Sequence, residues 1–161
     1  MILGVDPGAT GALAWLNPDG TLAAVADMPS VDGIVSGALL THLLDQHPHV
    51  DEAWVEQVAA RPGQGVSSVF KFGRSYGAIT GVLEARLIPV HYVTPAKWKG
   101  TARVNAPKGA TVARRKAISR RRALDLWPDH ADRFARAMDA DRAEAALIAR
   151  HGWLTTRGPD Q

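Results

Sequence analysis

The chain has 161 residues, of which 46% are hydrophobic, so it can bury one sizeable core and falls within the usual length of a single domain. No stretch approaches the roughly 20 apolar residues that a membrane span needs, and no basic leader precedes the first apolar run. We therefore expect a cytoplasmic protein without membrane contact. The absence of cysteine excludes disulfides and thiolate metal sites, so that oxygen or imidazole ligands must hold any metal.

The net charge of +3 hides an uneven distribution of charge along the chain. Ten Lys and Arg residues and no Asp or Glu lie between Lys97 and Arg122, and the remaining nine basic residues face sixteen acidic ones. A basic surface on an otherwise acidic protein is typical of binding to a polyanion such as DNA, whereas an ordinary solvated helix face mixes both signs. The candidate DNA-binding residues are Lys97, Lys99, Arg103, Lys108, Arg114, Arg115 and Lys116.

Three short strands are predicted at the start of the chain. Residues 2–6 form an apolar run, and the Asp-Pro-Gly that begins at Asp6 supplies turn chemistry before a second apolar run at 12–16. Asn17-Pro18-Asp19-Gly20 predicts another turn, followed by a third strand over 21–28. Tight turns between consecutive strands indicate an antiparallel meander.

The middle of the chain alternates between helical and strand patterns, which predicts a mixed α/β architecture. Ser67 or Ser68 is expected to cap the longer helix, after a loop rich in Gly and Pro. The expected segments are a helix over 31–46, a strand over 52–58, the loop at 61–65, a helix up to about Ala85 and a strand over 87–93.

The last third of the chain is expected to be mainly helical. Thr94 supplies a capping hydroxyl directly before Pro95, which is a favoured start for a short helix that ends near Lys99. The segments that follow are a mobile loop at 101–109, the basic helix at 110–126, which stops near Pro128, a last helix at 136–151, and a frayed tail from Thr156.

Four acidic residues stand where a solvating charge is not expected. Asp6 ends the first strand, and Glu56 lies among apolar residues of the strand over 52–58. Asp141 and Glu144 are spaced i,i+3 and therefore share one face of the last helix. An ionised carboxylate in apolar surroundings is costly unless it is paired or binds a cation, so these positions favour function.

Phosphodiester hydrolysis gives a reason to gather such carboxylates, because two Mg²⁺ ions activate the attacking water and stabilise the leaving oxygen. Alternatives remain for single residues: Asp6 could start a turn, and Glu144 could pair with an Arg. Asp139 is expected to interact with the helix N-terminus, but it would replace Asp141 as a ligand if the helix were rotated. Trp98 could stack on a base, although the core is the favoured place for it.

Several motifs resemble those of RuvC-type Holliday-junction resolvases. The opening Ile2-Leu3-Gly4-Val5-Asp6-Pro7-Gly8 resembles the first-strand motif of this family, and Val55-Glu56-Gln57-Val58 resembles its second acidic motif. The stretch from Phe70 to Val90 looks like the family's helix and following strand, and Asp141-Arg142-Ala143-Glu144-Ala145 looks like its C-terminal acidic motif. The similarity covers about residues 1–151 in the family's order.

The resemblance implies an RNase H-like (retroviral-integrase-like) fold, with a five-stranded mixed sheet flanked by helices. It makes residues 1–151 a single nuclease domain and 152–161 a C-terminal tail. The implied activity is a homodimeric endonuclease that resolves four-way DNA junctions by paired symmetric nicks, with two Mg²⁺ ions for which Mn²⁺ can substitute. Whether a branch-migration motor partners the protein stays open.

The resemblance also assigns roles to residues of this chain. Asp6, Glu56, Asp141 and Glu144 are the implied metal ligands, and Lys99 matches a family lysine near the scissile backbone. A second family lysine falls in a region where four residues compete: Lys108, Arg114, Arg115 and Lys116. Gly73, Gly77 and Gly81 lie on one helix face, for which the family implies dimer formation, while packing on the protein's own sheet or last helix is the alternative.

The chain departs from the family at two places. Glu144 stands where the family has Asp, and its extra methylene shifts the carboxylate without abolishing metal binding. Ala59 and Ala60 stand where bacterial members carry an aromatic side chain that stacks on a junction base, which puts a fixed cleavage sequence in doubt.

Other functions are weighed against the resolvase. A branched-DNA-binding protein without catalysis would keep the basic segment, and an RNase H-like nuclease could act on another nucleic acid. An ATP-binding phosphotransferase begins with a similar strand and glycine turn but needs a second lobe that 161 residues cannot contain.

Overall fold

A five-stranded mixed sheet forms the centre of the molecule. In this computed structural model, which describes residues 1–47, 49–59, 63 and 65–157, the strand order is β3-β2-β1-β6-β7. The first three strands form an antiparallel meander, and the last two add to β1 in parallel. The mixed sheet and the meander are confirmed. The strands are β1 (Ile2–Asp6), β2 (Ala12–Leu16), β3 (Leu22–Asp27), β6 (Glu52–Glu56) and β7 (Val90–Val93).

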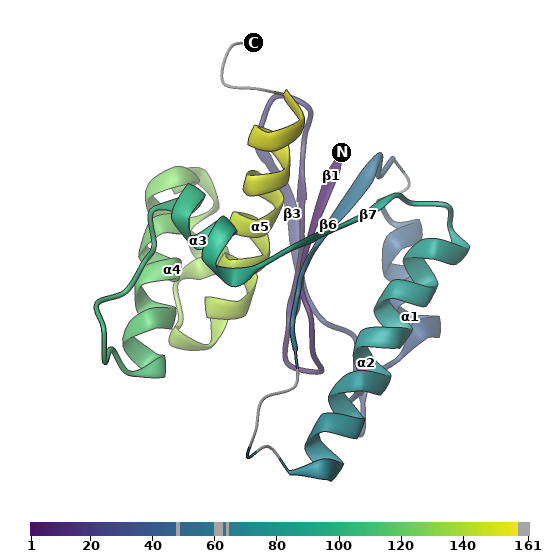
Figure 1. The fold of residues 1–161 in the computed structure, drawn as a ribbon. Helices are drawn as coiled ribbons and strands as arrows, with labels where there is room; N and C mark the ends of the chain where they lie inside the picture. Colours follow the sequence, from purple (N-terminus) through teal and green to yellow (C-terminus); the bar gives the residue numbers. More distant parts are fainter. Residues whose placement is uncertain (48, 60–62, 64, 158–161) are drawn as a thin grey trace.

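Helices cover both faces of this sheet (Figure 1). On one face lie α1 (Gly37–Asp45) and α2 (Val66–Ala85), and on the other lie α3 (Pro95–Ala102), α4 (Val112–Leu126) and α5 (Ala140–Arg157). Side chains alternate between the two faces along a strand, so Ile2 joins the core under α5 while Leu3 and Val5 join the core under α1 and α2.

A small hairpin precedes α1, where the sequence pattern predicts only a helix over 31–46. β4 (Ser30–Val31) pairs with β5 (Ile34–Val35) across a turn in which Asp32 and Gly33 have φ angles of 52° and 74°. An Asp-Gly pair with positive φ is a favoured two-residue hairpin turn. The helix therefore starts only at Gly37, after Ser36, whose side chain accepts a hydrogen bond from the backbone of Leu39.

Other boundaries differ from the prediction for local reasons. α2 begins at Val66 after Gly65, without the side-chain cap expected from Ser67 or Ser68. Thr94 precedes Pro95 of α3, but its hydroxyl makes no capping bond. α3 continues to Ala102, so the predicted loop is shorter, and β7 starts at Val90 because Leu87 adopts a left-handed φ of 57°.

The C-terminal region also differs from the expected helix over 136–151. Two 3-10 segments, η1 (Pro128–Phe134) and η2 (Ala137–Asp139), follow α4, and α5 begins only at Ala140. The helix then continues to Arg157, so residues 152–157, predicted as tail, are helical. Ala60, residues 61, 62 and 64 of the predicted loop and residues 158–161 lie outside the described residues. None of the described helices is both long and apolar enough to cross a membrane.

Close packing of α5 on the sheet fixes where its first turns lie. A Cβ at Gly4 of β1 would overlap the carbonyl oxygen of Ala145, and one at Gly152 would overlap the indole of Trp54. The buried face of α5 is built largely of Ala, including Ala145 and Ala149, which lets the backbones approach. The start of α5 is thereby brought to the end of β1.

Candidate metal centre and nucleic-acid interface

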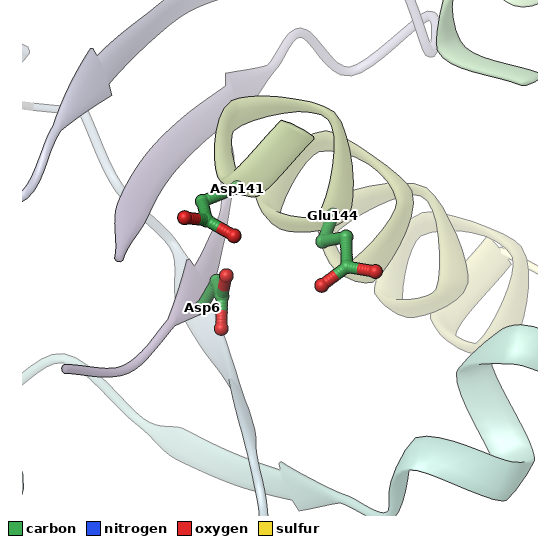
Figure 2. A group of neighbouring side chains, drawn as sticks. All are labelled: Asp6, Asp141 and Glu144. Atoms are coloured by element: carbon green, nitrogen blue, oxygen red, sulfur yellow. The ribbon is translucent and has the colours of Figure 1, made fainter. Parts of the chain in front are cut away.

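Three of the predicted acids converge at one end of the sheet. Asp6 is the last residue of β1, and Asp141 and Glu144 point toward it from the start of α5 (Figure 2). Each of these partly buried carboxylates offers an oxygen, and the three oxygens lie within 4.8 Å of one another. Oxygen ligands at this spacing fit a hard cation such as Mg²⁺ or Mn²⁺.

Glu56, the fourth predicted acid, lies beside this group but is not part of it among the described residues. It is the last residue of β6, which runs parallel to β1, so it reaches the same end of the sheet. Its Oε1 accepts a hydrogen bond of 2.8 Å from the indole Nε1 of Trp98, which is fully buried. Trp98 is therefore a core residue, as favoured, and its polar edge orients Glu56.

Helix α4 contacts both acids of α5. The Lys116 Nζ lies 2.7 Å from the Asp141 Oδ1, and the Ser119 Oγ donates to the Glu144 Oε1 at 2.9 Å. Lys116 and Ser119 are three residues apart and so lie on the same face of the helix. Of the four competing basic residues, Lys116 is the one that the structure places on a carboxylate of the site.

Burial and neighbouring charges raise the pKa of two of the acids, Asp6 and Glu144. Burial raises the pKa of Asp6 well above its usual value, and the charges of Glu144, Asp141 and Glu56 raise it further. Burial also raises the pKa of Glu144, although Lys99 and Ser119 oppose the shift. Burial lowers the pKa of Lys116, but its hydrogen bond to Asp141 and the surrounding carboxylates outweigh that effect and raise it. A bound cation would relieve the repulsion among these acids.

Asp139 belongs to a different network. Its buried carboxylate accepts hydrogen bonds from the backbone and guanidinium of Arg136, and Arg142 lies 3.4 Å from it. Arg142 also forms two 2.6 Å bonds to Asp27 at the end of β3. Asp139 thus ties the turn before α5 to Arg136 and Arg142, and it is not grouped with Asp6 and Glu144 in the part of the chain that is described.

Between Lys97 and Arg122, the predicted DNA-binding side chains make fewer bonds to the protein itself than the other basic residues do. Arg120 and Arg122 donate to backbone carbonyls, and Arg121 pairs with Asp125. Lys99 lies with its Nζ 4.9 Å from the ring centroid of Trp98 and close enough to Glu144 to affect its pKa. Lys116 pairs with Asp141, whereas the other six candidates form no ion pair with an acid in the described structure: Lys97, Lys99, Arg103, Lys108, Arg114 and Arg115.

The glycine face of α2 packs against no other part of the chain that the structure describes. Among these residues, a Cβ added at Gly73, Gly77 or Gly81 would meet no atom within 4 Å, so the predicted alternative of packing on the sheet or on α5 is wrong. Val66 and Phe70 extend this face toward the start of the helix, and their exposed fractions are 86% and 65%. The face is open and partly apolar.

Sequence reasoning did not identify the partners of the acids. Ser119 and Trp98 carry no charge, and neither lies near Glu144 or Glu56 in the sequence. The only signal available was the spacing of Ser119 three residues after Lys116, which places both on one helix face.

Comparison with solved structures identifies the architecture. RuvC of T. thermophilus in complex with a Holliday junction substrate matches 98% of this chain and 96% of its own, with a TM-score of 0.65 and 15% identity. The chain has the RuvC fold. A second T. thermophilus RuvC structure has a TM-score of 0.56 at 17% identity, covering 96% and 95% of the two chains. The yeast mitochondrial resolvase Ydc2 follows with a TM-score of 0.47 at 15% identity, covering 97% and 80%. No family model and no curated protein matches the sequence.

Proposed function

We propose that this protein is a metal-dependent DNA endonuclease that resolves four-way junctions by paired symmetric nicks. The observation that carries the proposal is the convergence of Asp6, Asp141 and Glu144 within 4.8 Å at one end of a RuvC-type sheet. A bound pair of Mg²⁺ ions would activate water and stabilise the leaving oxygen of a phosphodiester. Asp6, Asp141 and Glu144 would hold the metals, with Glu56 as the further ligand from β6.

The lysines near the carboxylates have complementary roles in this proposal. Lys99 on α3 and Lys116 on α4 both lie near the acids, since Lys116 lowers the pKa of Asp6 and Lys99 lowers that of Glu144. An ammonium at such a place would bind a phosphate oxygen of the scissile strand, which would otherwise be repelled by the acids. These two lysines therefore bring the DNA backbone to the site.

The remaining basic side chains would bind the phosphates of the duplex arms of the junction. Arg114 and Arg115 lie on the exposed first turn of α4, and Lys97, Arg103 and Lys108 lie on α3 or the loop after it. All belong to the layer that contains the site, so a strand held by them would pass the carboxylates. Each phosphate contact adds affinity that falls with rising salt.

Symmetric nicks require two sites, and a second copy of the chain would supply the other. The open face of α2 lies on the opposite side of the sheet from α3 and α4 (Figure 1), where a partner would not cover the carboxylates. Its glycines would let two helices approach closely, and the exposed Val66 and Phe70 would be buried.

Cleavage of a synthetic four-way junction tests the function. The labelled junction, a matched linear duplex and an RNA–DNA hybrid are incubated with the protein in Mg²⁺, Mn²⁺ or EDTA, with Asp6→Asn as the control. We expect paired nicks in opposite strands of the junction alone, in either metal, and a loss of at least about 100-fold in Asp6→Asn because a ligand is removed.

Other outcomes would select the other candidates. Binding of the junction without cleavage in either metal would make the protein a branched-DNA binder. Preferential cleavage of the hybrid would make it an RNase H-like nuclease with a different substrate. Wild-type cleavage by Asp6→Asn would contradict the role of this residue as a ligand.

A further inference from the structure

Ser119 is a buried hydroxyl whose best partner is a carboxylate of the site. Only 1% of the residue is exposed, and its Oγ lies 2.9 Å from the Glu144 Oε1. Among the described residues, its other hydrogen-bond acceptor is the backbone carbonyl of Arg115 one turn earlier, at 3.5 Å. A hydroxyl has a single proton, and the shorter contact to a charged oxygen is the stronger bond. The proton of Ser119 is thus directed at Glu144.

Glu144 needs such a partner more than the two aspartates of the site do. Its carboxylate is separated from the backbone by two methylenes, so one more torsion must be fixed to hold its oxygens near Asp6 and Asp141. Burial supplies part of that restriction, but the Ser119 bond selects one orientation and leaves the second oxygen of Glu144 for another ligand. An aspartate at position 144 would end about one methylene short of the hydroxyl.

We propose that Ser119 is a positioning residue that fixes the Glu144 carboxylate for metal binding, and that the two form a matched pair across α4 and α5. The inference rests on the proposed function, since it assigns the metal to this carboxylate group. Ser119 itself does not reach the metal or the substrate in this assignment; it acts through Glu144.

The pairing is tested by a double-mutant cycle on Mn²⁺ affinity, measured by electron paramagnetic resonance of free Mn²⁺ and by calorimetry, with Mg²⁺ as competitor. The variants are Ser119→Ala, Glu144→Asp and the double variant. Loss of a hydrogen bond to a metal ligand typically weakens metal binding by 10- to 100-fold, so we expect about a tenfold loss for Ser119→Ala. In the Glu144→Asp background the same substitution should change the affinity less than about twofold, because the contact is already absent.

Two further variants separate positioning from a general effect on the fold. Ser75 is also 1% exposed, and its hydroxyl accepts a hydrogen bond from the backbone of Val35, away from the acids. Ser75→Ala should therefore lower the melting temperature about as much as Ser119→Ala and leave Mn²⁺ affinity unchanged. Ser119→Cys keeps the shape with a weaker donor, and it should bind Mn²⁺ more tightly than Ser119→Ala.

The outcomes distinguish this inference from the proposed function. Wild-type Mn²⁺ affinity in Ser119→Ala, or equal losses in the Glu144 and Asp backgrounds, would overturn the pairing while the metal site stands. Absence of Mn²⁺ binding by the unmodified protein would overturn the proposed function and the pairing together.

Discussion

Asp6 is crowded by other carboxylates, and this crowding has a measurable cost to the metal-free protein. Burial and the charges of Glu144, Asp141 and Glu56 hold its pKa well above the value it has in the unfolded chain. Between these two pKa values the folded state binds more protons than the unfolded state, so stability falls as pH rises from about 4 through the folded pKa. The site is electrostatically strained at neutral pH.

Asp6→Asn should therefore stabilise the protein in EDTA while it abolishes cleavage. We expect little difference near pH 4 and a gain of about 1 kcal/mol near pH 8, which is about 2–4 °C in melting temperature for a chain of this size. Added Mg²⁺ should reverse the order, because only the unmodified site binds the metal that stabilises the fold. Thermal unfolding at both pH values, with and without metal, measures both effects.

The control for this experiment is Asp132→Asn, which removes a charge from a side chain that is 71% exposed and pairs with the neighbouring Arg133 rather than with a residue of the site. It should not change the pH dependence. If Asp6→Asn and Asp132→Asn showed the same stability at pH 8 in EDTA, the repulsion assigned to Asp6 would be wrong.

At the scale of elements, the start of α5 decides where Asp141 and Glu144 lie. Arg142 joins Asp27 of β3 to Asp139, and Asp139 in turn holds Arg136 of the preceding turn. This network ties the first turn of the helix to the edge of the sheet. It therefore sets the position of the acids without contacting them.

Asp139→Asn should loosen that turn. The hydrogen bonds to Arg136 and the charges of Arg136 and Arg142 lower the pKa of Asp139, although burial opposes the shift. The contribution of this carboxylate to stability is therefore present above the unfolded pKa near 4 and is lost as pH falls through the folded pKa. We expect a loss of about 1.5–3 kcal/mol at pH 7, typical of hydrogen bonds to a charged group, and a difference that shrinks below about pH 4. Urea unfolding at pH 7 and pH 3.5 measures this, and an unchanged difference at pH 3.5 would contradict the ionic account.

The sequence predicts helices and strands best where one hydrophobic periodicity, that of a strand or that of a helix, dominates a segment. The five strands of the sheet can be predicted from apolar runs, and the three acids that converge can be predicted from charges in apolar surroundings. The hairpin before α1 is not predicted, because the helical pattern over 31–46 extends across the Asp32-Gly33 turn signal. The predicted start of α5 lies four residues before the observed one, since the first turn of the helix is held by ion pairs with Asp27, far away in the sequence.

The candidate site shows the same limit. Residues bearing charge could be named, but their partners depend on how α3 and α4 pack beside α5, which no local pattern encodes. The indole of Trp98 and the hydroxyl of Ser119 are ordinary core side chains in the sequence, and only the tertiary contacts give them roles. The fold of the sheet is thus predictable from short segments, whereas the geometry of the site is not.

At the scale of the whole molecule, the sheet separates two surfaces. The acids and the basic side chains lie with α3, α4 and α5 on one side, and the open glycine face of α2 lies on the other (Figure 1). Two copies joined through α2 would leave both sites free to engage one junction. In the proposed function, the oligomeric state would therefore be linked to the pairing of the nicks.

Gly77→Glu tests this link. Its position is exposed with no atom within 4 Å of an added Cβ, so the monomer can accept the side chain, and the helix gains up to about 1 kcal/mol in propensity. Across a two-fold interface, however, the substitution would place two like charges against each other in a close helix contact. Sedimentation should show a dimer for the unmodified protein and a monomer for Gly77→Glu, while Gly100→Glu, at an equally open position on α3, should remain dimeric.

Since the carboxylates are untouched, the Gly77→Glu monomer should bind Mn²⁺ normally, and it should nick junction strands singly rather than in pairs. Paired nicks from a protein that stays monomeric on the junction would show that this face of α2 has no part in symmetric cleavage.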